Sequence, residues 1–205
     1  MRARDWQFPA PVWHKEGVFI PSRKQIRSQG ARERREGPAL DAEALERLGL
    51  HYVGRYATSR GKLIAYLKRK LTERGWVGDQ APDLAAQVER YAALGYVDDQ
   101  AFAEARARSL GGRGYGQGRV RQALHAARID EEHAASAHEI AFDGRWAAAL
   151  RYAEKRRIGP WARVEPDRPA RQKAIAAMIR GGHDFELARV IVSAQPGEIP
   201  EDVPK

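Results

Sequence analysis

Apolar residues recur every three or four positions through most of the chain, and no stretch alternates convincingly between apolar and polar residues. In the run that begins at Asp41, the apolar positions are Leu45, Leu48, Tyr52 and Tyr56. This spacing follows the period of about 3.6 residues of an amphipathic helix, whereas a half-buried strand would repeat every second residue. The pattern therefore predicts an all-α fold between residues 41 and 194.

Residues with known capping preferences stand where the predicted helices start and stop. Ser59 is a candidate N-cap for a helix whose stripe includes Leu63 and Leu67, and Gly75 is placed to end it. A third helix carries Leu84, Val88 and Tyr91 on one face and stops at Gly95.

The same order of three helices then returns twice. Asp98, Asp130 and Asp184 are candidate caps of later helices, Leu124 lies 53 residues after Leu71, and Met178 lies 54 residues after Leu124. One such unit is too small to bury its apolar face, so stacked neighbours would complete the core. The pattern predicts three tandem three-helix repeats, at residues 41–96, 97–142 and 143–194, with Leu67, Leu124 and Met178 in their cores.

The two ends of the chain lack this periodicity. Residues 1–40 contain four prolines among polar and basic residues, and we expect a mostly disordered arm that the fold does not need. A chain starting near Pro38 would then keep its helices. Residues 195–205 are expected to form a flexible tail.

Composition narrows the function classes. The 43% of apolar and 31% of charged residues fit a folded protein, and the net charge of +9 favours a polyanionic or acidic partner. The absence of cysteine excludes disulfides, thiolate zinc sites and cysteine nucleophiles. No apolar run reaches the roughly 18 residues of a membrane helix, and the basic N-terminus has no continuous apolar segment typical of a secretory signal. We expect a cytoplasmic protein.

No catalytic motif is recognisable. The glycines at 111, 112, 114, 116 and 118 match neither the P-loop nor the dinucleotide-binding pattern, and they follow a predicted helix rather than a strand. They are interpreted as a flexible turn, a hinge beside a contact surface. Asp98 and Asp99 are interpreted as caps of the helix that they begin, not as metal ligands. The expectation is a non-enzymatic protein without a cofactor or metal.

The strongest functional signal is basic charge. Residues 105–129 contain six arginines and no acid, and the helix after Ser59 is also rich in basic residues. Such a footprint indicates a binding surface for phosphate or carboxylate groups. The predicted partner-binding residues are Lys62, Lys68, Arg69, Arg106, Arg113, Arg119 and Arg121.

Over about residues 45–194 the chain resembles the RecX family, regulators of the RecA recombinase. The resemblance rests on "GYVDDQAFA" and "GRVRQAL", supported by "SRGKLIAYLKRKLTERGW" and "AAMIRGGHDFELARVIV". The residues matched to the family motif, expected to be structural, are Gly95, Tyr96, Asp98, Asp99, Phe102, Ala103, Gly116 and Leu124. The chain departs from the family at Ala123, where a glutamate is usual, at Ala127–Arg128, where Lys-Gly is usual, and at His183, where an aromatic residue is usual.

The resemblance implies a curved, elongated array of three repeats, and we expect a monomer. Family members lie in the groove of the RecA–single-stranded-DNA filament, bridge its protomers, and restrain filament growth, ATP hydrolysis and strand exchange in recombinational repair and the SOS response. They do so without catalytic chemistry of their own.

Two alternatives stay open. A stand-alone helical DNA-binding protein would bind through phosphate contacts without RecA, whereas for a RecA regulator the sequence leaves direct DNA contact open. A tetratricopeptide-like scaffold is disfavoured because its repeat is about 34 residues, shorter than the spacing found here.

Overall fold

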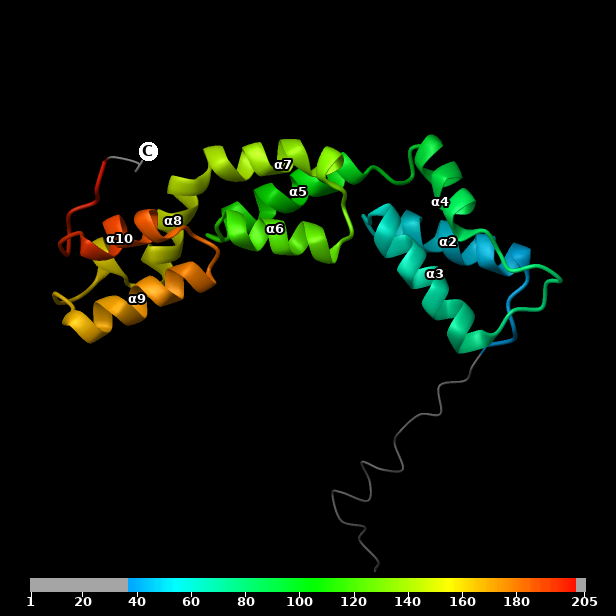
Figure 1. Cartoon of the computed structure of the whole chain (residues 1–205), viewed down its shortest axis with the longest axis horizontal. Helices are drawn as coiled ribbons and strands as arrows, with labels where there is room; N and C mark the ends of the chain where they lie inside the picture. The colour runs from blue at the N-terminus through cyan, green and yellow to red at the C-terminus, as the bar shows by residue number, and fades with distance from the viewer. Residues whose placement is uncertain (1–36, 202–205) are drawn as a thin grey trace, which may run out of the picture. The chain divides into compact units, whose positions relative to one another are not determined.

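The computed structural model describes residues 37–201, and all regular elements in that range are helical (Figure 1). The α-helices are α2 (Ala42–Arg55), α3 (Arg60–Arg74), α4 (Leu84–Ala93), α5 (Asp99–Gly112), α6 (Gln117–Ala126), α7 (Glu131–Asp143), α8 (Arg145–Arg156), α9 (Arg168–Arg180) and α10 (Phe185–Ser193). A short 3-10 helix, η1 (Gly159–Trp161), follows α8. None of the described helices is both long and apolar enough to cross a lipid bilayer. The prediction of an all-α fold is confirmed.

Most of the helices begin at a side chain that accepts a hydrogen bond from a backbone N–H three residues later. These N-caps are Asp41, Ser59, Asp83, Asp98, Asp130, Asp167 and Asp184. Each cap satisfies one of the free N–H groups of a first helical turn, which fixes where the helix starts. At the other end of α3, Gly75 has a φ of 79° and donates its N–H to the Leu71 carbonyl. The predicted caps at Ser59, Asp98, Asp130 and Asp184 are confirmed.

Buried apolar side chains form three separate clusters, each supplied mainly by three consecutive helices. The first lies among α2, α3 and α4, the second among α5, α6 and α7, and the third among α8, α9 and α10. Leu67, Leu124 and Met178 belong to different clusters, and each is at most 2% exposed. The helical stripes predicted from the sequence therefore face three small cores.

Leu40 corrects the predicted start of the packed chain. The sequence predicts that Leu40 belongs to the N-terminal arm, but its side chain is fully buried in the first core. Its N–H donates to the Gly75 carbonyl at 3.0 Å, and its carbonyl accepts from the N–H of Val77 at 3.0 Å. This short backbone bridge lies outside the helices, so helical periodicity in the sequence does not predict it. Residues 1–36 of the predicted arm lie outside the described residues.

The segment after α10 also makes a specific contact. Gly197, with a φ of 91°, donates its N–H to the carbonyl of Pro160 in η1 at 2.8 Å. The predicted flexible tail therefore includes at least one residue that is hydrogen-bonded to the third repeat. Residues 202–205 lie outside the described range.

Candidate partner-binding surface

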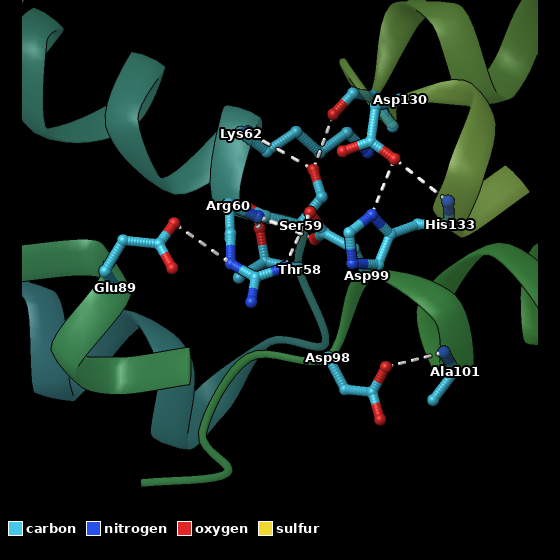
Figure 2. Close-up of polar contacts among 11 residues, drawn as sticks. Thr58, Ser59, Arg60, Lys62, Glu89, Asp98, Asp99, Ala101, Asp130 and His133 are labelled. Atoms are coloured by element: carbon cyan, nitrogen blue, oxygen red, sulfur yellow. Dashed lines mark hydrogen bonds and ion pairs between the residues drawn. The ribbon is translucent and has the colours of Figure 1, made fainter. Parts of the chain in front are cut away.

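Asp98 and Asp99 cap two different helices (Figure 2). Asp98 accepts a hydrogen bond from the N–H of Ala101 at 2.8 Å and so caps α5. Asp99 is only 4% exposed and accepts from the N–H of Arg60, in the first turn of α3, at 2.8 Å. Its second oxygen lies 3.5 Å from the Arg60 guanidinium. The prediction that both aspartates cap the helix they begin is correct for Asp98 and wrong for Asp99, which satisfies a helix of the preceding repeat.

Ser59 also connects the first and second repeats. Its hydroxyl accepts from the N–H of Lys62 at 3.2 Å and donates to the carbonyl of Ala127, after α6, at 2.5 Å. The backbones of the two repeats approach so closely here that a Cβ on Gly61 would lie 2.4 Å from the Cβ of Arg128. Arg128 has a φ of 55°, a left-handed conformation that favours glycine. Glycine is the residue that the family resemblance leads one to expect there.

Asp130 and His133 extend this polar junction (Figure 2). Asp130 accepts from the backbone N–H of His133 at 2.9 Å, and the same oxygen lies 2.6 Å from the ring Nδ1 of His133. The backbone hydrogen bond, followed by the ring contact, lowers the pKa of Asp130, and the Asp130 side chain raises the pKa of His133. Arg60 is also 3.2 Å from Glu89. These groups compensate one another's charge, and within residues 37–201 no group of three or more histidines and acids is placed to hold a metal ion.

The glycine cluster is a packed junction between the second and third repeats. Gly111 and Gly112 complete α5, whereas Gly116 and Gly118 donate their N–H groups to the carbonyls of Gly181 and Gly182 at 3.0 and 2.9 Å. A Cβ on Gly116 would lie only 2.4 Å from the Gly182 carbonyl oxygen. The predicted flexible hinge is therefore wrong, because the backbone here is bonded to another repeat and leaves no room for a side chain.

His183 is buried at the same junction. Its Nε2 lies 3.1 Å from the carbonyl of Gly114, and its ring meets the ring of Tyr152 edge-on at 5.2 Å. Burial lowers the pKa of His183, with the Gly114 hydrogen bond opposing the shift. Because a carbonyl only accepts, Nε2 carries the proton in the neutral ring. The His183 ring thus occupies a buried position where the family usually has an aromatic residue, and it adds a hydrogen bond to the Gly114 carbonyl.

All seven basic residues predicted to bind a partner are exposed, but they do not form one patch. Arg106 in α5 and Arg113, the C-cap of α5, lie on the same side of the helix as Phe102, because positions three, four and seven apart coincide on a helix. The ammonium of Lys62 lies 5.0 Å from the centre of the Phe102 ring, which brings α3 to this face. The guanidinium groups of Arg113 and Arg119 lie 5.7 and 5.6 Å from the ring of Tyr115.

The other predicted basic residues lie apart from that group. Arg69 on α3 pairs with Glu73 at 3.2 Å, and Lys68 is its exposed neighbour. Arg121 follows Arg119 by two positions, so it faces another direction. It lines a pocket of about 460 Å³ with residues of α6 and α7 that include His138.

Two basic residues of α8 were missed in the sequence. Lys155 donates to the carbonyl of Arg113 at 3.2 Å, and Arg151 donates to the carbonyl of Gly111 at 3.2 Å. They bring the charge of the third repeat to the end of α5. The sequence shows the basic run at 155–157, but only the hydrogen bond from Lys155 to the second repeat places it beside this surface.

An open pocket of about 560 Å³ runs along the start of this surface. Its lining combines the loop before α3, the loop before α5 and one face of α5. The lining residues are Ala57, Thr58, Lys62, Gly95, Tyr96, Asp98, Ala101, Phe102, Ala105, Arg106 and Ser109. Aromatic rings and cations therefore meet in one depression.

Comparisons with known proteins agree on one family. Residues 98–137 match the family model described as the second three-helix domain of RecX. The regulatory protein RecX of Myxococcus xanthus is 28% identical over 164 residues, which cover 74% of this chain and 86% of that protein. The regulatory protein RecX of Xanthomonas campestris (strain B100) is 35% identical over 124 residues, which cover 60% of this chain and 73% of that protein.

Solved structures show the same fold at low sequence identity. A crystal structure of RecX from Lactobacillus salivarius superposes with a TM-score of 0.53 at 14% identity, covering 73% of this chain and 93% of that one. A crystal structure of a regulatory protein RecX superposes with a TM-score of 0.56 at 18% identity, covering 85% of this chain and 79% of that one. On the sequence matches together with the shared helical fold, the chain belongs to the RecX family of regulatory proteins.

Proposed function

We propose that this protein binds the RecA–single-stranded-DNA filament and restrains RecA ATP hydrolysis, filament extension and strand exchange. Membership of the RecX family carries the proposal, because the resemblance that first suggested the family also implies RecA as the partner. The protein would act in the cytoplasm, in recombinational repair and the SOS response. It would act by binding, without catalytic chemistry, as the relatives' name of regulatory protein suggests.

The exposed arginines of the second repeat support this proposal physically. A RecA filament presents protein carboxylates and DNA phosphates, and the planar guanidinium of arginine suits both. Arg119 and Arg121 are both exposed on α6. Arg119 lies beside Tyr115 and Arg121 lines the pocket with α7, so the two guanidinium groups lie on different faces of the second repeat.

The experiment adds the protein to RecA on single-stranded DNA and follows ATP hydrolysis. We expect wild type to suppress hydrolysis, less strongly as salt rises, because exposed charge pairs are screened. The double variant Arg119→Glu, Arg121→Glu should lose most of the suppression while its free energy of unfolding changes by about 0.5 kcal/mol or less.

A matched control reverses two arginines outside the second repeat. Arg171 is half-buried and Arg189 is exposed, and they pair with Glu165 and Glu186. The double variant Arg171→Glu, Arg189→Glu changes the net charge equally and should suppress RecA nearly as well as wild type. Equal loss in both double variants would mean that net charge, not this surface, is responsible, and no suppression by wild type would refute the proposal.

A stand-alone DNA-binding protein remains the second candidate, favoured by the acid-free stretch of residues 105–129. The same assay separates the two hypotheses when DNA binding is measured without RecA. Strong DNA binding with no effect beyond competition for DNA would favour the second candidate.

A further inference from the structure

Among the family-motif residues, Tyr96 has no evident structural role. Gly95 adopts a φ of 77°, Asp98 and Asp99 cap helices, and Ala103 is fully buried. Gly116 and Leu124 are also buried, and Phe102 is half-buried beneath Lys62. The Tyr96 side chain, by contrast, is 55% exposed and meets only the edge of the Tyr91 ring among aromatic groups of the described chain, at 6.3 Å.

The ring of Tyr96 borders the 560 Å³ pocket together with that of Phe102, and two cations, Lys62 and Arg106, line the same pocket. Asp98 is the acid in the lining, and its carboxylate is already engaged by the Ala101 N–H. The pocket therefore offers aromatic surface beside positive charge.

The surface continues along α5 beyond the pocket. Phe102, Arg106, Ser109 and Arg113 are spaced four, three and four residues apart, which places them on one helical face. Arg113 donates its Nε to the carbonyl of Ser109 at 3.3 Å, so its side chain folds back along that face. At about 1.5 Å of rise per residue, the face from Phe102 to Arg113 is roughly 16 Å long. We call Lys62, Tyr96, Phe102, Arg106 and Arg113 the α5 track.

The cations of the α5 track have no carboxylate partner among residues 37–201, since no ion pair involves Lys62, Arg106 or Arg113 there. Two positions from Arg106, Arg108 pairs with Glu104 at 2.7 Å on another face of the same helix. Unpaired cations in line on one face favour an extended anionic ligand.

We propose that the α5 track binds single-stranded nucleic acid, with an unpaired base stacked on Tyr96 and the phosphates neutralised by Lys62, Arg106 and Arg113. Exposed aromatic surface beside a row of cations suits a strand whose bases and phosphates are both accessible. A duplex keeps its bases stacked inside, where they cannot reach Tyr96. An acidic peptide could pair with the cations but has no base to stack on the exposed Tyr96 ring.

The inference names the ligand of one part of the surface on which the proposed function rests. Its test omits RecA, so either proposal can fail alone. Fluorescence anisotropy would follow the binding of a fluorescein-labelled oligothymidylate to the full chain, with a hairpin duplex as competitor. The variants are Tyr96→Leu, Tyr96→Phe, Arg106→Gln and, as the control on the other face of α5, Arg108→Gln.

We expect Tyr96→Leu to weaken affinity about tenfold and Tyr96→Phe to keep it, because base stacking needs a ring but not its hydroxyl. Arg106→Gln should weaken binding and reduce the slope of log K against log salt by about 0.7, the value for one phosphate contact on a single strand. Arg108→Gln should bind like wild type, and the duplex should compete poorly. Circular dichroism would show that each variant is folded.

Three results would overturn the inference: no binding by wild type, unchanged affinity in folded Tyr96→Leu, or equal competition by the duplex. Unchanged affinity in Tyr96→Leu together with a weaker effect of that variant on RecA ATP hydrolysis would instead assign the ring to a protein partner.

Discussion

Asp99 makes a contact that spans 39 residues of sequence. The first turn of α3 contains no acid of its own, and its N-cap Ser59 accepts only one of the N–H groups that lack an intrahelical partner. Asp99 accepts a second, from Arg60, while nearly excluded from solvent. A buried acceptor of this kind stabilises the structure mainly because removing it leaves the donor unsatisfied.

Asp99→Ala should therefore lower the free energy of unfolding by about 1–3 kcal/mol, measured by urea denaturation. Asp99→Asn retains an oxygen that accepts from Arg60, so it should cost less than the alanine variant. Glu89→Gln removes an exposed ion-pair partner of Arg60 and should cost about 0.5 kcal/mol or less. Equal stability of the alanine variant and wild type would mean that water replaces the carboxylate at no cost.

His183 should make stability depend on pH. Burial lowers its pKa in the folded protein below the unfolded value of about 6.5, so the unfolded state takes up the proton first as pH falls. Its contribution is complete above pH 6.5 and is lost between that pH and the lower folded pKa. The nearby Asp184 carboxylate opposes the shift but does not reverse it.

The stability of wild type should consequently fall more steeply than that of His183→Phe between about pH 7 and pH 5, measured by thermal unfolding at each pH. Parallel curves for wild type and His183→Phe would show that the buried histidine does not titrate differently on unfolding.

At the scale of elements, the turn between α5 and α6 depends on glycine at some positions and not at others. Gly116 touches the backbone of Gly182, whereas a Cβ on Gly111, within α5, would meet nothing within 4 Å. One glycine is thus required by packing between repeats, and the other is only a weak helix former.

Gly116→Ala should destabilise the protein by about 1–3 kcal/mol, because the added carbon overlaps the Gly182 carbonyl, which is held in place by the Gly118 N–H. Gly111→Ala should leave stability unchanged or raise it by up to about 1 kcal/mol, since alanine favours helix. Differential scanning calorimetry measures both. Equal tolerance of the two substitutions would support the flexible turn expected from the sequence.

The same elements show what the sequence could predict. The stripes of α3 and α6 and the caps at Ser59 and Asp98 follow from contacts within a few residues, so local patterns were sufficient for them. Asp99 and the glycine cluster act on partners in another repeat, and a single chain contains no local sign of which repeats touch. Exposure of the basic residues was predicted, but their grouping on α5 required the contact between Lys62 and Phe102.

For the molecule as a whole, the described chain has three small cores joined by polar and backbone contacts. Ser59 and Asp99 connect the first and second repeats, and Gly116 and His183 connect the second and third. In repeat proteins of this kind, stability is approximately the sum of repeat stabilities and interface terms. A substitution that destabilises one repeat should therefore increase local unfolding most in that repeat and least in the repeat farthest from it.

Leu67→Ala tests this distribution of stability. Leu67 is fully buried in the first core, so its truncation should cost about 2–5 kcal/mol. Hydrogen exchange should then rise most in α2, α3 and α4 and least in α8, α9 and α10, because the latter share no core with Leu67. Met178→Ala is the matched variant in the third core and should give the reverse order. Uniform loss of protection in both variants would mean that the repeats unfold as one cooperative unit, with junctions such as the Asp99–Arg60 contact strong enough to transmit every local defect along the chain.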